Sequence, residues 1–412
     1  MKATTLPFLW SICLLLLLTN CNQNSAVQKI STPCKLGGEP NLHISKNGKA
    51  FLSWVEYLND TTDVLAFSTL TNKEWSSPKI IAKGNNWFVN WADFPSIVSF
   101  NDNNQHLAAH WLQKSAIGTY DYDVKIAQSS DGGTKWQIPF TPHTDGIAAE
   151  HGFVSMLPVG ADEIFATWLD GRYTKTENHS DGHDHEGQGG AMTLRGAFFN
   201  NQGKLSGEIE LDNKVCDCCS TSAALTKNGV IVAYRDRSGE EIRDIAIVRQ
   251  IGKDWTRPRS IYADNWEIAG CPVNGPKIIA DGGNKVAVAW YTMANNQPQV
   301  KVAISSDAGA NFSEPIQVDE GNPLGRVDLV FDKDAIIVSW LENIGEEKAA
   351  IRLAKIQSTG QIEQRMTLTQ TSSARSSGFP IMEKLEHQLL VAWTEIVDED
   401  ENTTVQTAIV NF

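Results

Sequence analysis

A short apolar run that ends in an aromatic side chain recurs seven times along the sequence, at intervals of 50 to 66 residues. Runs of four or five apolar residues between turn-forming residues are typical of β-strands and are too short for helices. The aromatic residues that end the seven copies are Trp54, Trp111, Trp168, Tyr234, Trp290, Trp340 and Trp393. This regular recurrence predicts one structural unit repeated seven times.

Each copy has further strand-like segments on both sides. A first strand is predicted before it, as in residues 40–44 and 94–98, and a third strand after it, as in residues 64–67 and 300–304. A turn and an aromatic-x-x-Pro step then precede a predicted fourth strand. The four steps of this kind are Trp75 to Pro78, Trp136 to Pro139, Trp255 to Pro258 and Phe312 to Pro315. Four antiparallel strands repeated at this period predict an all-β fold, a β-propeller.

The two ends of the chain indicate how the ring closes. The seventh copy stops at Phe412 after its third strand, whereas residues 27–30 precede the first copy without another strand to pair with. We therefore expect the N-terminal strand to complete the last blade. The prediction is a single propeller domain over residues 27–412 with seven blades, or with six if one copy is not a blade.

The N-terminus has the pattern of an export signal. Lys2 is followed by an apolar run over residues 6–18, which is too short to span a bilayer, and the run stops at Cys21. The Leu-x-x-Cys ending resembles a bacterial lipobox, which implies lipidation of Cys21. We expect a signal peptide with lipobox over residues 1–21 and a tether over residues 22–26; an ordinary signal peptide is the alternative. The protein is then an exported lipoprotein of the periplasm or outer membrane, attached to the membrane through this anchor alone.

The formal net charge of −14 bears on partners. An acidic chain repels the phosphate backbone, so a nucleic-acid partner is not expected. An anionic ligand would need local arginines, because the overall charge gives it no long-range attraction. Nothing in the composition indicates an oligomer, and we expect a monomer.

Two turns share a more specific motif. Ser129-x-Asp131-x-Gly133-x-x-Trp136 follows the third strand of the second copy, and Ser305-x-Asp307-x-Gly309-x-x-Phe312 follows that of the fifth. Both resemble the Asp-box of the sialidase (BNR-repeat) superfamily. The aspartate is expected to accept main-chain N–H groups across the turn, and the glycine to take a positive φ.

The resemblance implies a sialidase-like propeller but does not extend to the catalytic set. Sialidases of this superfamily are six-bladed and use three arginines, a tyrosine–glutamate pair and an aspartic acid, the first arginine lying in an early Arg-Ile-Pro motif. Residues 35–60 contain no arginine, and the first in the chain is Arg172. Asp170, Tyr234 and Glu241 are the only weak catalytic candidates. Whether the protein is an enzyme stays open, with an exo-glycosidase of sialidase type as the least favoured function.

One face of the predicted propeller collects unusual side chains. Loops that enter first strands and loops that join second to third strands emerge on the same side. This places Cys216, Cys218, Cys219 and Cys271 on one face, together with a long loop that contains His183. Thiolates and imidazole suit copper or zinc, whereas an exported protein also forms disulfides, so both interpretations stay open.

Five arginines are expected on the same face: Arg172, Arg235, Arg237, Arg243 and Arg326. If they point into the opening, they would bind a carboxylate or phosphate. For Arg235, Arg237 and Arg243, salt bridges between blades are the alternative. The favoured function is an envelope lipoprotein that binds a glycan or protein ligand on this face. A copper- or zinc-binding propeller is the first alternative.

Overall fold

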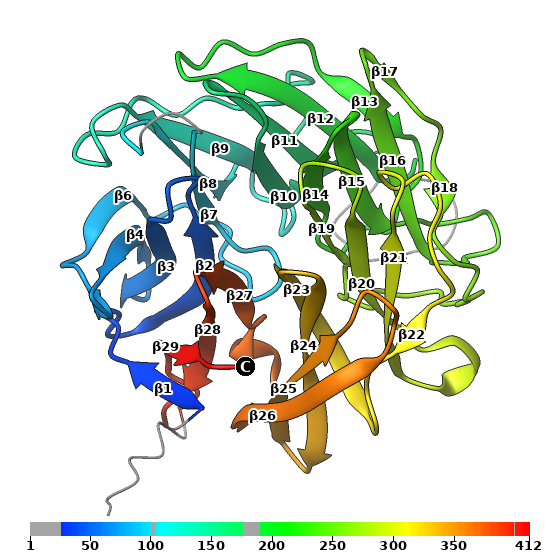
Figure 1. The fold of residues 1–412 in the computed structure, drawn as a ribbon. Helices are drawn as coiled ribbons and strands as arrows, with labels where there is room; N and C mark the ends of the chain where they lie inside the picture. The colour runs from blue at the N-terminus through cyan, green and yellow to red at the C-terminus, as the bar shows by residue number, and fades with distance from the viewer. Residues whose placement is uncertain (1–25, 101–103, 176–189, 399) are drawn as a thin grey trace, which may run out of the picture.

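The computed structural model describes residues 26–100, 104–175, 190–398 and 400–412, which form seven antiparallel sheets around one axis (Figure 1). The prediction of an all-β propeller with seven blades is confirmed. Blade 1 comprises β2 (Gly37–Ile44), β3 (Ala50–Asn59), β4 (Thr62–Thr71), β5 (Glu74–Trp75) and β6 (Lys79–Gly84). Blade 2 comprises β7 (Ser96–Ser99), β8 (Leu107–Lys114) and β9 (Tyr122–Ser129). Blade 3 comprises β10 (His151–Pro158), β11 (Glu163–Asp170), β12 (Thr193–Asn200) and β13 (Ile209–Asp212).

The remaining blades follow in chain order around the ring. Blade 4 comprises β14 (Ser222–Thr226), β15 (Gly229–Arg235), β16 (Ile245–Ile251), β17 (Asp254–Trp255) and β18 (Arg259–Ser260). Blade 5 comprises β19 (Lys277–Ala280), β20 (Val286–Thr292), β21 (Gln299–Ser305) and β22 (Ile316–Gln317). Blade 6 comprises β23 (Pro323–Asp332), β24 (Ala335–Gly345), β25 (Lys348–Ile356) and β26 (Ile362–Ser372). Blade 7 comprises β27 (Ile381–Leu385), β28 (Gln388–Ile396), β29 (Thr403–Val410) and β1 (Val27–Ile30). Two single-turn 3₁₀ helices lie at η1 (Ala294–Asn296) and η2 (Arg375–Ser377).

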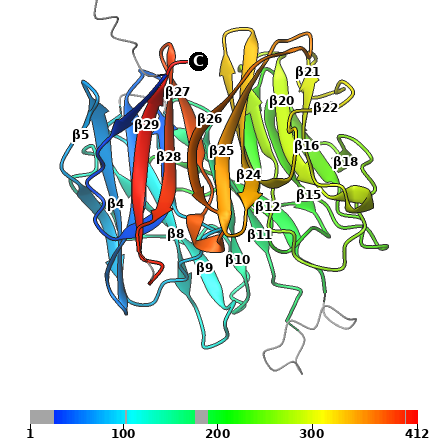
Figure 2. The same cartoon turned by 90° about the horizontal axis from the view of Figure 1, so that it is seen from below.

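The N-terminal strand closes the ring as the sequence predicts. β1 pairs antiparallel with β29, from Val27 opposite Val410 to Ile30 opposite Thr407. The innermost strand of every blade contacts that of the next, and β27 contacts β2, so the inner circle is continuous. Figure 2 shows the ring from its side, with the strands of all blades running between the same two faces.

Blade 2 departs from the predicted four strands. Its sheet has three strands, because the segment after Trp136 pairs with β9 only through a single bridge between Ile126 and Phe140. In blade 1, by contrast, the residues after Pro78 form β6, which pairs with β4 over Asp63–Phe67. The outer edge of blade 2 is therefore less covered than that of its neighbour.

The aromatic residues of the second strands are core residues, and several share an acidic partner. The indole Nε1 donates to the carboxylate two residues later in blades 1, 3, 6 and 7; these pairs are Trp54–Glu56 (2.7 Å), Trp168–Asp170 (2.9 Å), Trp340–Glu342 (2.7 Å) and Trp393–Glu395 (2.7 Å). A buried indole needs an acceptor for its N–H. The Trp-x-acid pattern in the sequence is therefore a structural feature of the blades.

The two motif turns have the expected hydrogen bonds. Asp131 Oδ1 accepts the N–H groups of Thr134 and Lys135, each at 2.9 Å, and Gly133 has φ 78°. In blade 5, Asp307 accepts the N–H of Asn311 at 2.8 Å. Each motif thus closes the turn after a third strand. No helix within the described ranges is both long and apolar enough to cross a membrane.

Candidate functional site

The three clustered cysteines lie in the loop that enters β14, and main-chain bonds to blades 3 and 4 fix this loop. The N–H of Val215 donates to Met192 O at 2.9 Å, and the N–H of Cys216 donates to Arg235 O at 3.0 Å. Cys216 and Cys219 are buried, and Cys218 is partly exposed. The loop is therefore held as part of the blade, and its thiols occupy defined positions.

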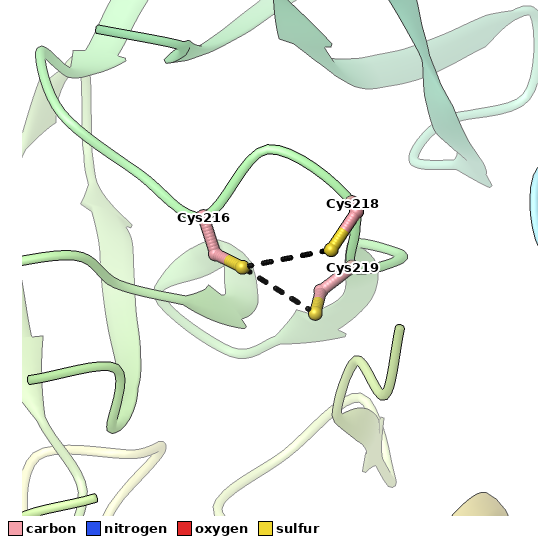
Figure 3. A group of neighbouring side chains, drawn as sticks. All are labelled: Cys216, Cys218 and Cys219. Carbon is pink, nitrogen blue, oxygen red and sulfur yellow. Dashed lines mark hydrogen bonds between the residues drawn. The ribbon is translucent and has the colours of Figure 1, made fainter. Parts of the chain in front are cut away.

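Figure 3 shows the three side chains directed toward one another. Cys216 Sγ lies 3.6 Å from Cys219 Sγ and 4.0 Å from Cys218 Sγ, and one ligand atom from each of the three falls within 4.8 Å of the others. A disulfide would need about 2.05 Å. Thiolates around one tetrahedral ion with metal–sulfur bonds of about 2.3 Å stand about 3.8 Å apart. The two observed distances lie on either side of this value.

Two further cysteines differ in their relation to this group. Cys271, in the loop that enters β19, is exposed, and its hydrogen bond with the Cys218 thiol lowers the pKa of Cys271. Cys34 is buried near Val405 and Thr404 of blade 7, where burial raises its pKa to about 12. Cys271 therefore borders the three-sulfur group through Cys218, whereas Cys34 is an inert core thiol.

A buried cation accompanies the sulfurs. Arg243 Nη1 donates to Cys216 Sγ at 3.3 Å, and its Nη2 donates to Glu241 at 2.7 Å. The hydrogen bonds from Cys218 and Cys219, together with the charges of Arg243 and Arg235, hold the pKa of Cys216 well below its usual range. A thiolate is the form that binds metal, so this environment favours a ligand at Cys216.

The other predicted arginines are engaged within the protein. Arg235 donates to the carbonyl oxygens of Asn274, Arg243 and Tyr291 and is 1% exposed. Arg326 donates to Ser377 and to the carbonyls of Gly378 and Ala374. These bonds tie adjacent blades together and use the guanidinium donors that a ligand carboxylate would need.

Arg237 and Arg172 form ion pairs. Arg237 lies 2.8 Å from Glu241 and 3.4 Å from Asp217, and Arg172 lies 2.7 Å from both Asp170 and Glu208. Both arginines thus form ion pairs within their own blade and its entry loop, rather than between blades. Arg237 borders the cysteine group through Asp217 of the cysteine loop and through Glu241, which Arg243 also contacts.

The three weak catalytic candidates have separate structural partners. Asp170 accepts the Trp168 indole and the Arg172 guanidinium, and these bonds help to lower its pKa to about 2 despite burial. The Tyr234 hydroxyl donates to Asp212 at 2.6 Å, and Glu241 pairs with Arg237 and Arg243. These contacts give each a structural role in its own blade and provide no shared reaction centre.

A different acid cluster lies on the same face and escaped the sequence analysis. The Tyr122 hydroxyl lies 2.8 Å from Glu150 and 3.3 Å from Asp93. Burial raises the pKa of Glu150 to about 8 and that of Asp93 to about 7. The charges of Cys271 and Asp217 also raise the pKa of Glu150, so this cluster borders the cysteine group. Tyr122 begins β9, Glu150 directly precedes β10 and Asp93 lies in the loop before β7, so no local motif in the sequence links them.

In a second group of potential metal ligands, neighbouring cations already neutralise the carboxylates. The His143 and His151 rings stack in parallel at 3.8 Å, beside Asp123, Asp145 and Asp170. Parallel rings direct their lone pairs side by side rather than toward one ion. Lys125 and Arg172 already neutralise these carboxylates. His183, the predicted imidazole ligand, and Cys21, the predicted lipid attachment residue, lie outside the described residues.

The comparisons with known proteins concern the fold. No protein-family model and no curated protein matches the sequence. A protein of unknown function from Dyadobacter fermentans superposes over 94% of this chain and all of its own, with 13% identity and a TM-score of 0.50. An ulvan lyase of polysaccharide lyase family PL25 matches 78% of this chain and 79% of its own, with 12% identity and a TM-score of 0.50. The NanB sialidase of Streptococcus pneumoniae matches 93% of this chain and 69% of its own, with 12% identity and a TM-score of 0.45. At these identities the likeness is one of propeller fold.

Proposed function

We propose that this protein binds a thiophilic metal ion, copper(I) or zinc, through Cys216, Cys218 and Cys219, with Cys271 as a fourth ligand. The observation that carries the proposal is the spacing of 3.6 and 4.0 Å from Cys216 Sγ to the other two sulfurs. That spacing suits ligands of one ion and is too long for a disulfide.

The charge balance around the sulfurs supports the same conclusion. Three or four thiolates around one ion carry a net negative charge, which is costly to bury without a cation. Arg243, which is fully buried, contacts Cys216 and supplies that cation. Cys271 is exposed, so an ion has a path from solvent to the group. A trigonal site of three sulfurs suits copper(I), and a site of four suits zinc.

Metal analysis of the anaerobically purified protein tests this proposal. After reduction, the protein is loaded with copper(I) or zinc(II), excess ion is removed, and bound metal is measured per chain. We expect one ion per chain, lost in Cys216→Ser and Cys219→Ser and kept in Cys34→Ser, which serves as the matched buried control. Loss with Cys271→Ser for zinc but not for copper(I) would identify the trigonal copper site.

Two outcomes would contradict the metal-binding proposal. Wild-type protein that retains no metal and yields two disulfides on mapping would show that the cysteines are structural. Equal metal retention in wild type and Cys216→Ser would place the ion elsewhere. Either finding overturns the proposal.

Export and lipid attachment remain part of this proposal. An exported thiolate protein needs a metal or a reductant to keep neighbouring thiols from oxidising. Labelling with a radioactive fatty acid tests the anchor: wild type is expected to take up label, and Cys21→Ala to lose it. Unlabelled wild type in the soluble fraction would contradict it.

A second function is favoured by the Tyr122, Glu150 and Asp93 cluster. A phenol between two carboxyl groups with raised pKa values resembles an acid–base set, and the fold is shared with glycan-acting enzymes such as the ulvan lyase. We infer a glycan ligand for this part of the face. Release of fluorophore from 4-methylumbelliferyl glycosides, lost in Glu150→Gln and kept in Glu163→Gln, would support it. Release of fluorophore from none of these glycosides, or equal release by wild type and Glu150→Gln, would count against it.

A further inference from the structure

A cavity lies at the junction of blades 1 and 2, formed by residues away from the cysteine loops. It has a volume of about 400 Å³ and is lined by β6 and the segment after it, by β8 and β9, and by residues 136–139. This volume falls within the roughly 300–1,000 Å³ of small-molecule sites. The cavity lies beside the blade whose outer edge lacks a full fourth strand.

Three indole rings form its apolar walls. Trp87 and Trp111 lie 5.6 Å apart, tilted by 31°, and Trp136 packs edge-on against Phe67. Trp87 and Trp136 are only partly buried. Gly84 permits this arrangement, because a Cβ at that position would lie 2.4 Å from Trp87 Nε1. The position of the Trp87 ring therefore depends on a glycine.

The polar lining consists mainly of neutral amides. Asn85, Asn86, Gln113 and Gln137 line the cavity, and Lys83 is its only charged side chain. These amides offer both donors and acceptors, and the lining contains no carboxylate or arginine that would select a charged ligand.

Flat apolar rings combined with neutral amides match one ligand class in particular. A sugar presents C–H groups on the faces of its ring and hydroxyl groups at its edge; the former pack on indoles, and the latter exchange hydrogen bonds with amides. We propose that this cavity is a binding site for a neutral saccharide of about two residues. It acts independently of the metal site and of the acid cluster on the cysteine face.

The experiment uses the purified protein and four neutral disaccharides, cellobiose, xylobiose, lactose and N,N′-diacetylchitobiose, with digalacturonic acid as the charged probe. Binding is followed by saturation-transfer NMR and tryptophan fluorescence. We expect at least one neutral disaccharide to bind in the millimolar range or tighter. Trp87→Ala and Trp136→Ala should each weaken that binding at least tenfold, and Trp87→Phe should weaken it less.

Two control variants distinguish saccharide binding in this cavity from effects elsewhere in the protein. Trp255 occupies the same aromatic-x-x-Pro position in blade 4 but does not line the cavity, so Trp255→Ala should leave saccharide binding unchanged. Cys216→Ser should abolish metal retention without affecting the saccharide. The inference is overturned if no neutral disaccharide binds at millimolar concentration, if digalacturonic acid binds best, or if binding survives both Trp87→Ala and Trp136→Ala.

Discussion

At the scale of single residues, the surroundings of Cys216 favour the ionised form of a buried thiol. Burial alone raises the pKa of a thiol, as at Cys34, where it reaches about 12. At Cys216 the pKa is instead lowered, because Cys218 and Cys219 donate hydrogen bonds and Arg243 supplies positive charge. The same residue type thus has a raised pKa beside blade 7 and a lowered pKa in the loop that enters blade 4.

Removal of the Arg243 charge should weaken the proposed metal site. In Arg243→Gln we expect the affinity for zinc or copper(I) to fall at least tenfold, since charge-assisted hydrogen bonds contribute roughly 1.5–3 kcal/mol. Competition with a chromophoric chelator measures this. Arg237→Gln, which removes a neighbouring arginine paired with Glu241 and Asp217, is the matched control. Equal affinities in wild type and a folded Arg243→Gln would contradict the role of Arg243.

A second prediction concerns how the stability of the fold depends on pH through Glu39. Burial raises the pKa of Glu39 to about 7 from its ordinary 4.5, so the folded state retains a proton that the unfolded chain releases. Stability linked to Glu39 is therefore full below about pH 4.5 and falls as pH rises toward 7. Glu39→Gln, which stays neutral, should gain stability relative to wild type over this range, on the order of 1–3 kcal/mol. Thermal unfolding at a series of pH values tests this, with exposed Glu163→Gln as control. A constant difference across pH would refute it.

At the scale of elements, repeated local bonds make the blades alike. In blade 7, the buried indole of Trp393 donates to Glu395, the carboxylate two residues later, and three other blades have the same bond. Several first strands also contain a glycine followed by a residue with positive φ: Glu39 (52°), Phe153 (53°) and Arg326 (55°), each at an irregularity of strand register. Such bulges redirect a side chain near the opening of the ring.

The Trp-x-acid bond gives a direct stability prediction. Glu395→Ala leaves the Trp393 N–H without its acceptor and should lower the free energy of unfolding by about 1–3 kcal/mol. Glu395→Gln keeps an acceptor oxygen and should cost less than half as much. Chemical denaturation of the two variants provides the comparison. If Ala and Gln cost the same, the hydrogen bond is not the source of the stability.

The sequence predicted elements better than it predicted sites, for a physical reason. Strand repeats arise from apolar periodicity within each segment, so the positions from Trp54 to Trp393 were sufficient to predict seven blades. The site depends on which loops meet and on side-chain direction. The sequence indicated Asp170 as a catalytic candidate, but Asp170 lies two residues after Trp168 and accepts the hydrogen bond of its indole. The start of β9 provides Tyr122, and two other loops provide Glu150 and Asp93; they share no local motif, so only the fold brings them together.

At the scale of the whole molecule, the ring depends on pairing between the chain's two ends. β1 is only four residues long, yet it supplies the outermost strand of blade 7, and Ile30 is 7% exposed. Thr407 donates its hydroxyl to Ile30 O at 2.9 Å, and Thr32 donates to Val405 O at 2.6 Å. A short strand from one end thus completes a blade formed by the other end.

Disruption of this closure should destabilise the whole propeller. Ile30→Asp places a charge in the core of blade 7 and should lower the free energy of unfolding by about 2–4 kcal/mol. Lys29→Thr, at the adjacent exposed position of β1, should change it by less than about 0.5 kcal/mol. Calorimetry should show one lowered transition for Ile30→Asp. An unchanged transition temperature would mean that β1 does not contribute to closing the ring.

The metal site is the central claim, and X-ray absorption spectroscopy of the loaded protein tests it most directly. The zinc or copper edge spectrum reports which atoms surround the ion and at what distance. The account predicts a first shell made only of sulfur, three or four atoms at about 2.3 Å, which changes in Cys216→Ser. A shell of nitrogen and oxygen, or a spectrum identical in wild type and Cys216→Ser, would contradict it.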